Sequence, residues 1–140
     1  MAKSKGRFNA QFNKGNRLTV EEPEDYNKMV PLFSLERLQS GSYCLSNLDK
    51  EDKAAFADAI FKRRNSTWNE IQQKDRHGLG FEKISVNSIR PSVPKFITED
   101  QANLIAFRFN GLKPMIGYRS KNVFYVLWFD HNYSVYDHGS

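Results

Sequence analysis

The last third of the chain limits the possible folds most strongly, because short apolar runs alternate there with turn residues. Between residues 102 and 138 the runs are rich in Val, Ile, Phe, Tyr and Trp, and the turn signals between them are Asn110-Gly111, Ser120-Lys121-Asn122 and Asp130-His131-Asn132. Period-2 runs joined by a few such residues are typical of consecutive antiparallel hairpins. The sequence therefore predicts a meander of four strands, at residues 104–109, 115–119, 123–129 and 134–136.

The third of these runs is apolar on both sides of the expected strand. One side would carry Val123, Tyr125 and Leu127, and the other would carry Phe124, Val126 and Trp128. Such a strand is expected in the middle of a sheet. The run is also the longest apolar stretch of the chain, yet it is far shorter than the roughly 18 apolar residues of a membrane span, so we expect no membrane association.

Two short helices are expected ahead of the meander. The first opens at residues 45–49 and the second at Asn65 or Ser66, and an extended piece follows at residues 81–89. Two helices joined by a tight turn would cover one face of a sheet. The predicted fold class is therefore α+β, with two N-terminal helices packed on a twisted, mainly antiparallel sheet of four to five strands.

The distribution of charge divides the chain into an arm and a domain. The formal net charge is +5, and residues 1–20 hold five cations and no acid, which accounts for the whole excess. Residues 1–28 contain too little apolar surface to order themselves, so we predict a flexible basic and acidic arm, either a tether to RNA or a solvated tail. Residues 29–140 are expected to form a single α+β domain.

Inside that domain the charge is uneven. Residues 101–121 carry Arg108, Lys113, Arg119 and Lys121 without any acid. A basic patch on an otherwise neutral domain favours phosphate binding. The single Cys44 cannot form an intramolecular disulfide, which is typical of a protein from the reducing cytoplasm.

The order of helix, helix and basic meander resembles the RelE/ParE superfamily of toxins from toxin–antitoxin systems. The residues that carry the resemblance are FRFNG at 107–111 and IGYRSKNVFYVLWFDHNYSVYDH at 116–138, and it extends over residues 47–138. It implies a RelE-like fold and a type II toxin that acts as a metal-independent, ribosome-dependent mRNA endoribonuclease. Its partners would be mRNA, the ribosome and a cognate antitoxin protein, with no cofactor. A ParE-like toxin that binds DNA gyrase, or an RNA-binding or adaptor module, is the alternative, since one fold hosts several functions.

The resemblance also assigns candidate catalytic residues. Arg119 matches the arginine of the family's YR motif, which contacts the scissile phosphate. His131 lies in the turn where the family places a cation or histidine, and Tyr136 matches the closing tyrosine. His138 returns to the same strand face two residues later, so it is the second candidate proton carrier. Imidazole and guanidinium suit proton transfer and phosphate binding, respectively.

The remaining basic residues would support the substrate. These substrate-binding residues are Arg108, Lys113, Lys121 and His77. Each assignment has a structural alternative: Arg119 as a cation paired with Asp130 or Asp137, His131 as turn chemistry, and Tyr136 as a core aromatic. His131, Asp137 and His138 could supply three metal ligands, but they lack an HExxH-like spacing or a cysteine partner, so no metal is expected.

Overall fold

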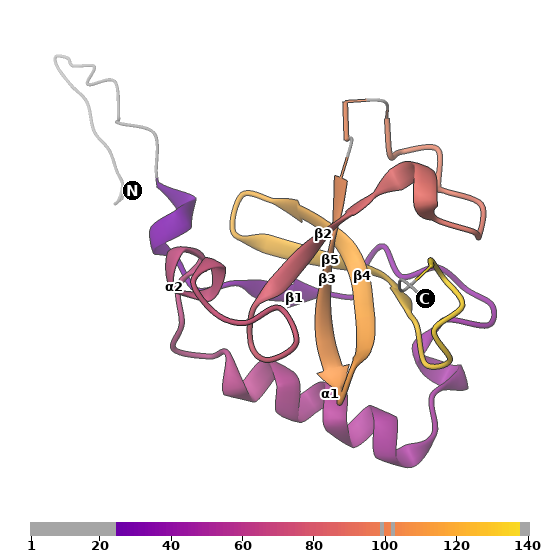
Figure 1. The fold of residues 1–140 in the computed structure, drawn as a ribbon, viewed down its shortest axis with the longest axis horizontal. Coiled ribbons are helices and arrows are strands. Elements are labelled where there is room, and N and C mark those ends of the chain that lie inside the picture. The colour runs from indigo at the N-terminus through magenta and orange to yellow at the C-terminus, as the bar shows by residue number, and fades with distance from the viewer. Residues whose placement is uncertain (1–24, 99, 102, 138–140) are drawn as a thin grey trace, which may run out of the picture.

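The computed structural model describes residues 25–98, 100–101 and 103–137. Its centre is a five-stranded mixed sheet with the order β1-β5-β4-β3-β2, and helix α1 runs across one side of it (Figure 1). The predicted arm at residues 1–28 lies almost wholly outside the described residues. The elements are β1 (Leu32–Ser34), α1 (Lys50–Lys62), α2 (Trp68–Gln72), β2 (Phe81–Ser85), β3 (Asn103–Asn110), β4 (Lys113–Ser120) and β5 (Val123–Phe129), with single 3-10 turns at Tyr26–Lys28, Leu45–Asn47 and Val86–Ser88.

The first three strands of the predicted meander are present and pair in antiparallel fashion. The two turns between them need backbone conformations with positive φ, which Gly111 adopts at 58° and Lys121 at 59°. Glycine reaches that region without steric cost, which makes Asn110-Gly111 a strong hairpin signal. β5 is an interior strand, as its two apolar sides suggested, but β4 occupies the middle of the sheet.

The predicted fold class is wrong in two respects. A strand, β1, precedes the helices and pairs in parallel with β5, so the sheet is mixed. Only α1 is a long helix, because α2 ends after five residues. The sequence did not predict β1, because three residues are too few to show a period of two. The strand forms along the outer edge of β5, whose backbone groups would otherwise be unpaired.

The predicted fourth strand at residues 134–136 is also absent. The buried carboxylate of Asp130 accepts the backbone N–H groups of Ser134, at 2.7 Å, and Val135, at 3.1 Å. A side chain that captures two backbone donors replaces the partner that a ladder would supply. The segment therefore folds back over the sheet and buries Val135 and Tyr136 on it.

The two faces of the sheet are covered differently. The helices close one face, where Phe56, Trp68 and Ile71 pack against Phe107, Phe124 and Phe129. The opposite face is covered by the C-terminal segment and the loop between β2 and β3, with a core of Ile84, Leu104, Ala106, Ile116, Leu127, Trp128, Val135 and Tyr136. Among the described residues no α-helix covers this second face, and polar side chains of its strands, such as Glu82 and Arg108, line a cavity there.

The register of β4 and β5 shifts between Ile116 and Gly117, because Leu127 is an extra residue of β5 at this β-bulge. A Cβ atom on Gly117 would lie 1.9 Å from the carbonyl oxygen of Tyr125, which is backbone and cannot move aside. We expect Gly117→Ala to lower the free energy of unfolding by about 3 kcal/mol or more, measured by urea denaturation. Gly78→Ala is the control, because its Cβ would meet nothing closer than 3.5 Å. Equal stability of the two variants would contradict the bulge geometry.

Candidate functional site

The residues predicted for the catalytic centre lie in separate places. Arg119 lies near the end of β4, with its guanidinium carbon 4.2 Å from the centre of the Trp68 ring, and its Nε donates to the Lys121 carbonyl at 2.6 Å. His131 follows the far end of β5, where its Nε2 lies 3.0 Å from the Ser42 carbonyl oxygen. Arg119 pairs with Phe124 near the start of β5, whereas His131 comes two residues after Phe129 at its end, and Phe124 and Phe129 are about 16 Å apart along the strand. Arg119 and His131 therefore do not meet at one phosphate.

A further candidate, Lys113, lies outside any common site. Lys113 donates to the buried carboxylate of Asp52 at 2.9 Å and joins β4 to α1. His138 lies outside the described residues, so the predicted pairing of its side chain with Tyr136 is not described either. Among the described residues, no group of three His, Cys, Asp or Glu side chains is arranged to hold a metal ion.

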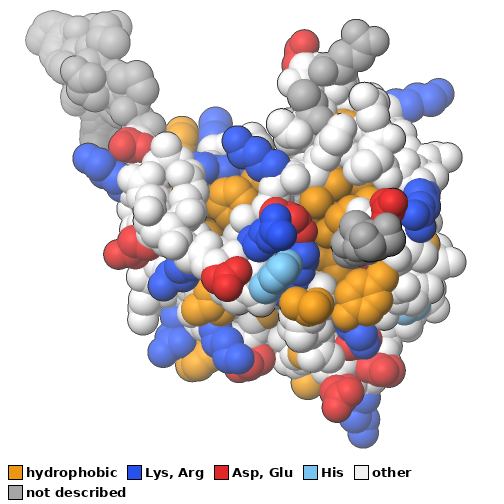
Figure 2. Space-filling view, viewed as in Figure 1, with side chains coloured by type: hydrophobic (Ala, Val, Ile, Leu, Met, Phe, Trp, Pro, Cys, Tyr) orange, Lys and Arg blue, Asp and Glu red, His pale blue; other side chains and the backbone are white. Residues whose placement is uncertain are grey.

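Three of the predicted residues do come together. A polar cavity of about 340 Å³ lies where β2, the loop before it, β3 and the C-terminal segment meet. Its wall includes Arg76, His77, Glu82, Arg108, Tyr136 and Asp137. We call this the Glu82–Arg108 cavity, after the pair at its centre. A histidine gathers with cationic and acidic side chains near the middle of the face drawn in Figure 2.

Glu82 connects the side chains of this cavity. Its Oε1 accepts from Nη2 of Arg108 at 2.5 Å and from the hydroxyl of Tyr136 at 3.3 Å. Its Oε2 lies 3.7 Å from Nη1 of Arg76. One carboxylate thus holds two guanidinium groups and a phenol on one side of the sheet, since Glu82 and Arg108 come from adjacent strands.

Arg108 has hydrogen-bonding capacity that the cavity does not use. Its side chain is 7% exposed, and its Nε and Nη1 have no hydrogen-bond partner in the part of the chain that the structure describes. Buried donors are normally paired, so two unpaired donors on one guanidinium make Arg108 a candidate anion-binding residue. These nitrogens are shielded from solvent, so an anion reaches them only when neighbouring side chains move, and the contact is then stronger than at an open surface.

The surroundings fix the protonation of the two acids. Partial burial alone raises the pKa of Glu82, but the hydrogen bond and charge of Arg108, the charge of Arg76 and the Tyr136 hydroxyl outweigh it and lower the pKa overall. Burial is the main cause that raises the pKa of Tyr136 to about 12. At neutral pH Glu82 is therefore a carboxylate, and Tyr136 is a neutral hydrogen-bond donor.

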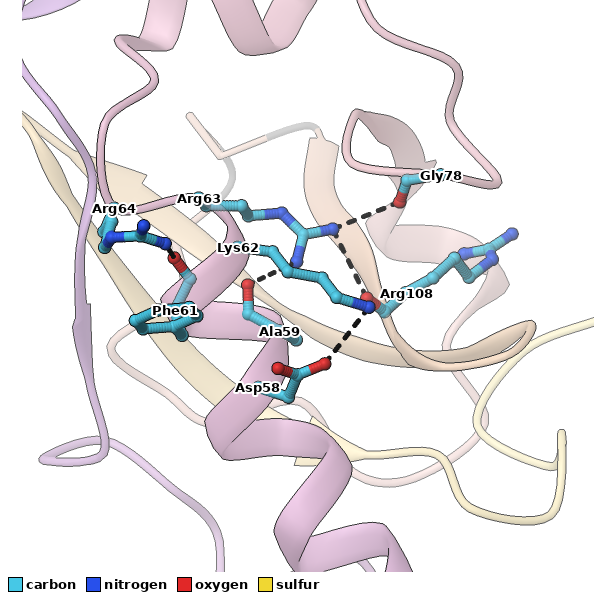
Figure 3. A network of polar contacts seen from close by, with 8 residues as sticks. All are labelled: Asp58, Ala59, Phe61, Lys62, Arg63, Arg64, Gly78 and Arg108. Carbon is cyan, nitrogen blue, oxygen red and sulfur yellow. Dashed lines mark hydrogen bonds and ion pairs between the residues drawn. The ribbon is translucent and has the colours of Figure 1, made fainter.

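Arg63 holds the loop that carries Arg76 and His77. Figure 3 shows its side chain between α1, Gly78 and Arg108, with the Arg108 side chain extending away from this network. Arg63 donates to the carbonyls of Ala59, Gly78, Leu79 and Arg108 at distances between 2.9 and 3.3 Å. A second cavity of about 270 Å³ lies on this side of the loop, and His77 and Arg108 line both cavities.

Sequence reasoning missed Glu82, Arg76 and Arg63. A signal existed for the first of these, because Glu82 shares its strand parity with the buried Ile84, just as Arg108 shares its parity with the buried Ala106. An acid and a cation on the apolar sides of two strands need a partner, and each is the partner of the other. Arg76 and Arg63 have no comparable signal, since both stand among other polar residues.

The Glu82–Arg108 pair gives a pH-dependent stability. A lowered pKa in the folded state means that the stabilisation is complete above about pH 4.3, the ordinary pKa of glutamate, and is lost as the pH falls through the folded pKa. We expect Glu82→Gln to lower the free energy of unfolding by about 1–2 kcal/mol at pH 7, and by progressively less as the pH falls below about 4.3. Denaturation across this pH range tests this, with the exposed Glu36→Gln as control. A deficit that does not depend on pH would contradict the pairing.

The described part of the chain contains no helix of the length and apolarity needed to cross a bilayer. No family model, curated protein or solved structure matches this chain. The resemblance to the RelE/ParE superfamily therefore stays a prediction from sequence motifs, and the function must be argued from the Glu82–Arg108 cavity itself.

Proposed function

We propose that this protein is a metal-independent endoribonuclease and that the Glu82–Arg108 cavity is its reaction centre. One observation supports this most directly: an ionised carboxylate is held against a buried guanidinium that keeps two nitrogens unpaired. The same cavity also contains a histidine, His77. These are the groups that phosphodiester cleavage needs when no metal takes part, namely a base, an anion-binding cation and an acid.

The proposed reaction is attack of a ribose 2′-hydroxyl on the adjacent phosphorus. Glu82 takes the proton from the 2′-oxygen as the bond from that oxygen to phosphorus forms. The bond from phosphorus to the 5′-oxygen then breaks, and His77 donates a proton to that oxygen. The products are a 2′,3′-cyclic phosphate and a free 5′-hydroxyl, so no water is consumed in this step.

The cations of the cavity stabilise the charge that builds up on the phosphate. Arg108 offers its unpaired nitrogens once the side chains over them move, at a position shielded from water where such interactions act most strongly. Arg76 lies beside Oε2 of Glu82, and its side chain is exposed. It can therefore move to contact the phosphate of a bound RNA. Tyr136 stays protonated because of its raised pKa and holds the carboxylate in place through its hydroxyl.

The sequence resemblance extends this proposal to the cell. On that basis the protein is a cytoplasmic toxin of a type II toxin–antitoxin system that cuts mRNA on the ribosome and is restrained by a cognate antitoxin. This extension depends on the motifs in residues 107–138 alone, because the mixed sheet differs from the fold that the resemblance implied. The cleavage chemistry of the cavity does not depend on it.

Cleavage of a fluorescent oligonucleotide that contains one ribonucleotide tests the proposal. We expect the purified protein to cut it in the presence of EDTA and to leave a 2′,3′-cyclic phosphate. Glu82→Gln and His77→Gln should each slow the reaction by about 10²- to 10⁴-fold, because each removes a proton-transfer group. His131→Gln is the matched control and should leave the rate unchanged, since His131 lies outside the cavity.

The controls also separate the alternatives. Loss of cleavage in His131→Gln with normal cleavage in His77→Gln would move the centre to the end of β5. Growth arrest on expression without cleavage in the test tube or of cellular transcripts would favour a gyrase-binding toxin. Salt-dependent RNA binding with neither cleavage nor arrest would leave an RNA-binding module.

A further inference from the structure

A row of aromatic side chains lies away from the cavity. Tyr118 and Tyr125 face each other across β4 and β5, with ring centres 5.0 Å apart and planes 16° apart. The ring of Phe96, from the loop between β2 and β3, lies 6.1 Å from that of Tyr118. The guanidinium carbon of Arg37 lies 4.8 Å from the centre of the Phe96 ring. We call Phe96, Tyr118 and Tyr125, together with Arg37, the aromatic platform.

The platform lies on the same face of the sheet as the Glu82–Arg108 cavity. Tyr118 packs with the core of that face, and so does Ala106, which shares its strand parity with Arg108. Arg108 pairs with Pro114, and Tyr118 follows Pro114 by four residues along β4. The separation along the strand is about 13 Å, which a short stretch of extended polynucleotide can span.

Packing does not require all of these rings. Cross-strand aromatic pairs stabilise sheets, which accounts for Tyr118 and Tyr125. Phe96, however, is 41% exposed although the neighbouring Ile97 packs into the core of this face. Its visible partner besides Tyr118 is an exposed arginine, and a cation over an aromatic ring contributes little at such a site. An exposed phenylalanine between an arginine and a tyrosine pair is therefore available for a ligand.

We propose that the aromatic platform binds unstacked bases of single-stranded RNA on one side of the linkage that the Glu82–Arg108 cavity cuts. Every base has a face that stacks on an aromatic ring, and stacking of this kind is stronger than the exposed contact between Arg37 and Phe96. Arg37 displaced from the ring can pair with a phosphate of the same strand. The link to cleavage depends on the proposed function, whereas the binding of bases does not.

Binding of an uncleavable strand tests the platform. The probe is a fluorescein-labelled 2′-O-methyl oligoribonucleotide, which has no free 2′-hydroxyl and so reports affinity alone. Phe96→Ala should weaken its binding by about 5- to 100-fold, measured by fluorescence anisotropy with the full chain. Phe61→Ala is the matched control, because Phe61 is an exposed phenylalanine on α1 that also lies under an arginine, Arg64, at 3.7 Å. It should bind like the wild type.

An abasic strand of the same length separates base stacking from phosphate binding. The wild type should bind it far more weakly than the strand with bases, and the effect of Phe96→Ala should disappear. Equal affinities of Phe96→Ala and Phe61→Ala, or equal affinities for the two strands, would overturn the platform. A protein that binds the probe as expected but cuts no RNA would refute the proposed function and leave the platform in place.

Discussion

The buried guanidinium of Arg63 is the interaction on which the arrangement of the site depends. Its partners are four backbone carbonyls, which come from the end of α1, from the loop before β2 and from β3. Burial lowers the pKa of Arg63 to about 10, so the group is still charged at neutral pH. A buried charge without these hydrogen bonds would cost several kcal/mol. The helix, the loop and the strand are therefore held at fixed separations, and the loop presents Arg76 and His77 to the cavity.

This constraint explains why helices cover one face of the sheet and loops cover the other. Arg63 reaches its partners from the helix side, where its guanidinium also lies 4.9 Å from the centre of the buried Phe107 ring. With α1 fixed there, the aromatic core between the helices and the sheet occupies that side. The opposite side has only loops and the C-terminal segment for cover. Glu82, Arg108 and Tyr118 lie on this loop-covered face, beside its core residues. They therefore line a cavity and an exposed platform instead of packing under a helix.

The sequence could predict the parts of the fold that depend on neighbours along the chain. Asn110-Gly111 and the apolar runs around it identified the hairpins, because turn conformation and alternating burial are local properties. β1 could not be found in this way, since its three residues form a strand only beside β5. The predicted strand at residues 134–136 failed for a related reason: the Asp130 carboxylate, which precedes it, competes for the same N–H groups. Both errors come from partners that a single-sequence pattern does not show.

For the candidate site, the sequence could likewise predict which residue types take part, but not which of them lie close together in space. Arg108, Tyr136 and His77 were chosen for their chemistry, and they line one cavity, but the acid that joins Arg108 to Tyr136 comes from β2. The motif that placed Arg119 close to His131 in the chain says nothing about their separation in space, because an intervening strand carries them to opposite ends of a hairpin. A carboxylate beside a buried arginine can serve stability alone, but then all donors of the arginine should be paired. Arg108 spends one nitrogen on Glu82 and leaves two without a partner among the described residues, so an anion that reaches them after a side-chain movement would not compete with Glu82 for the same nitrogen.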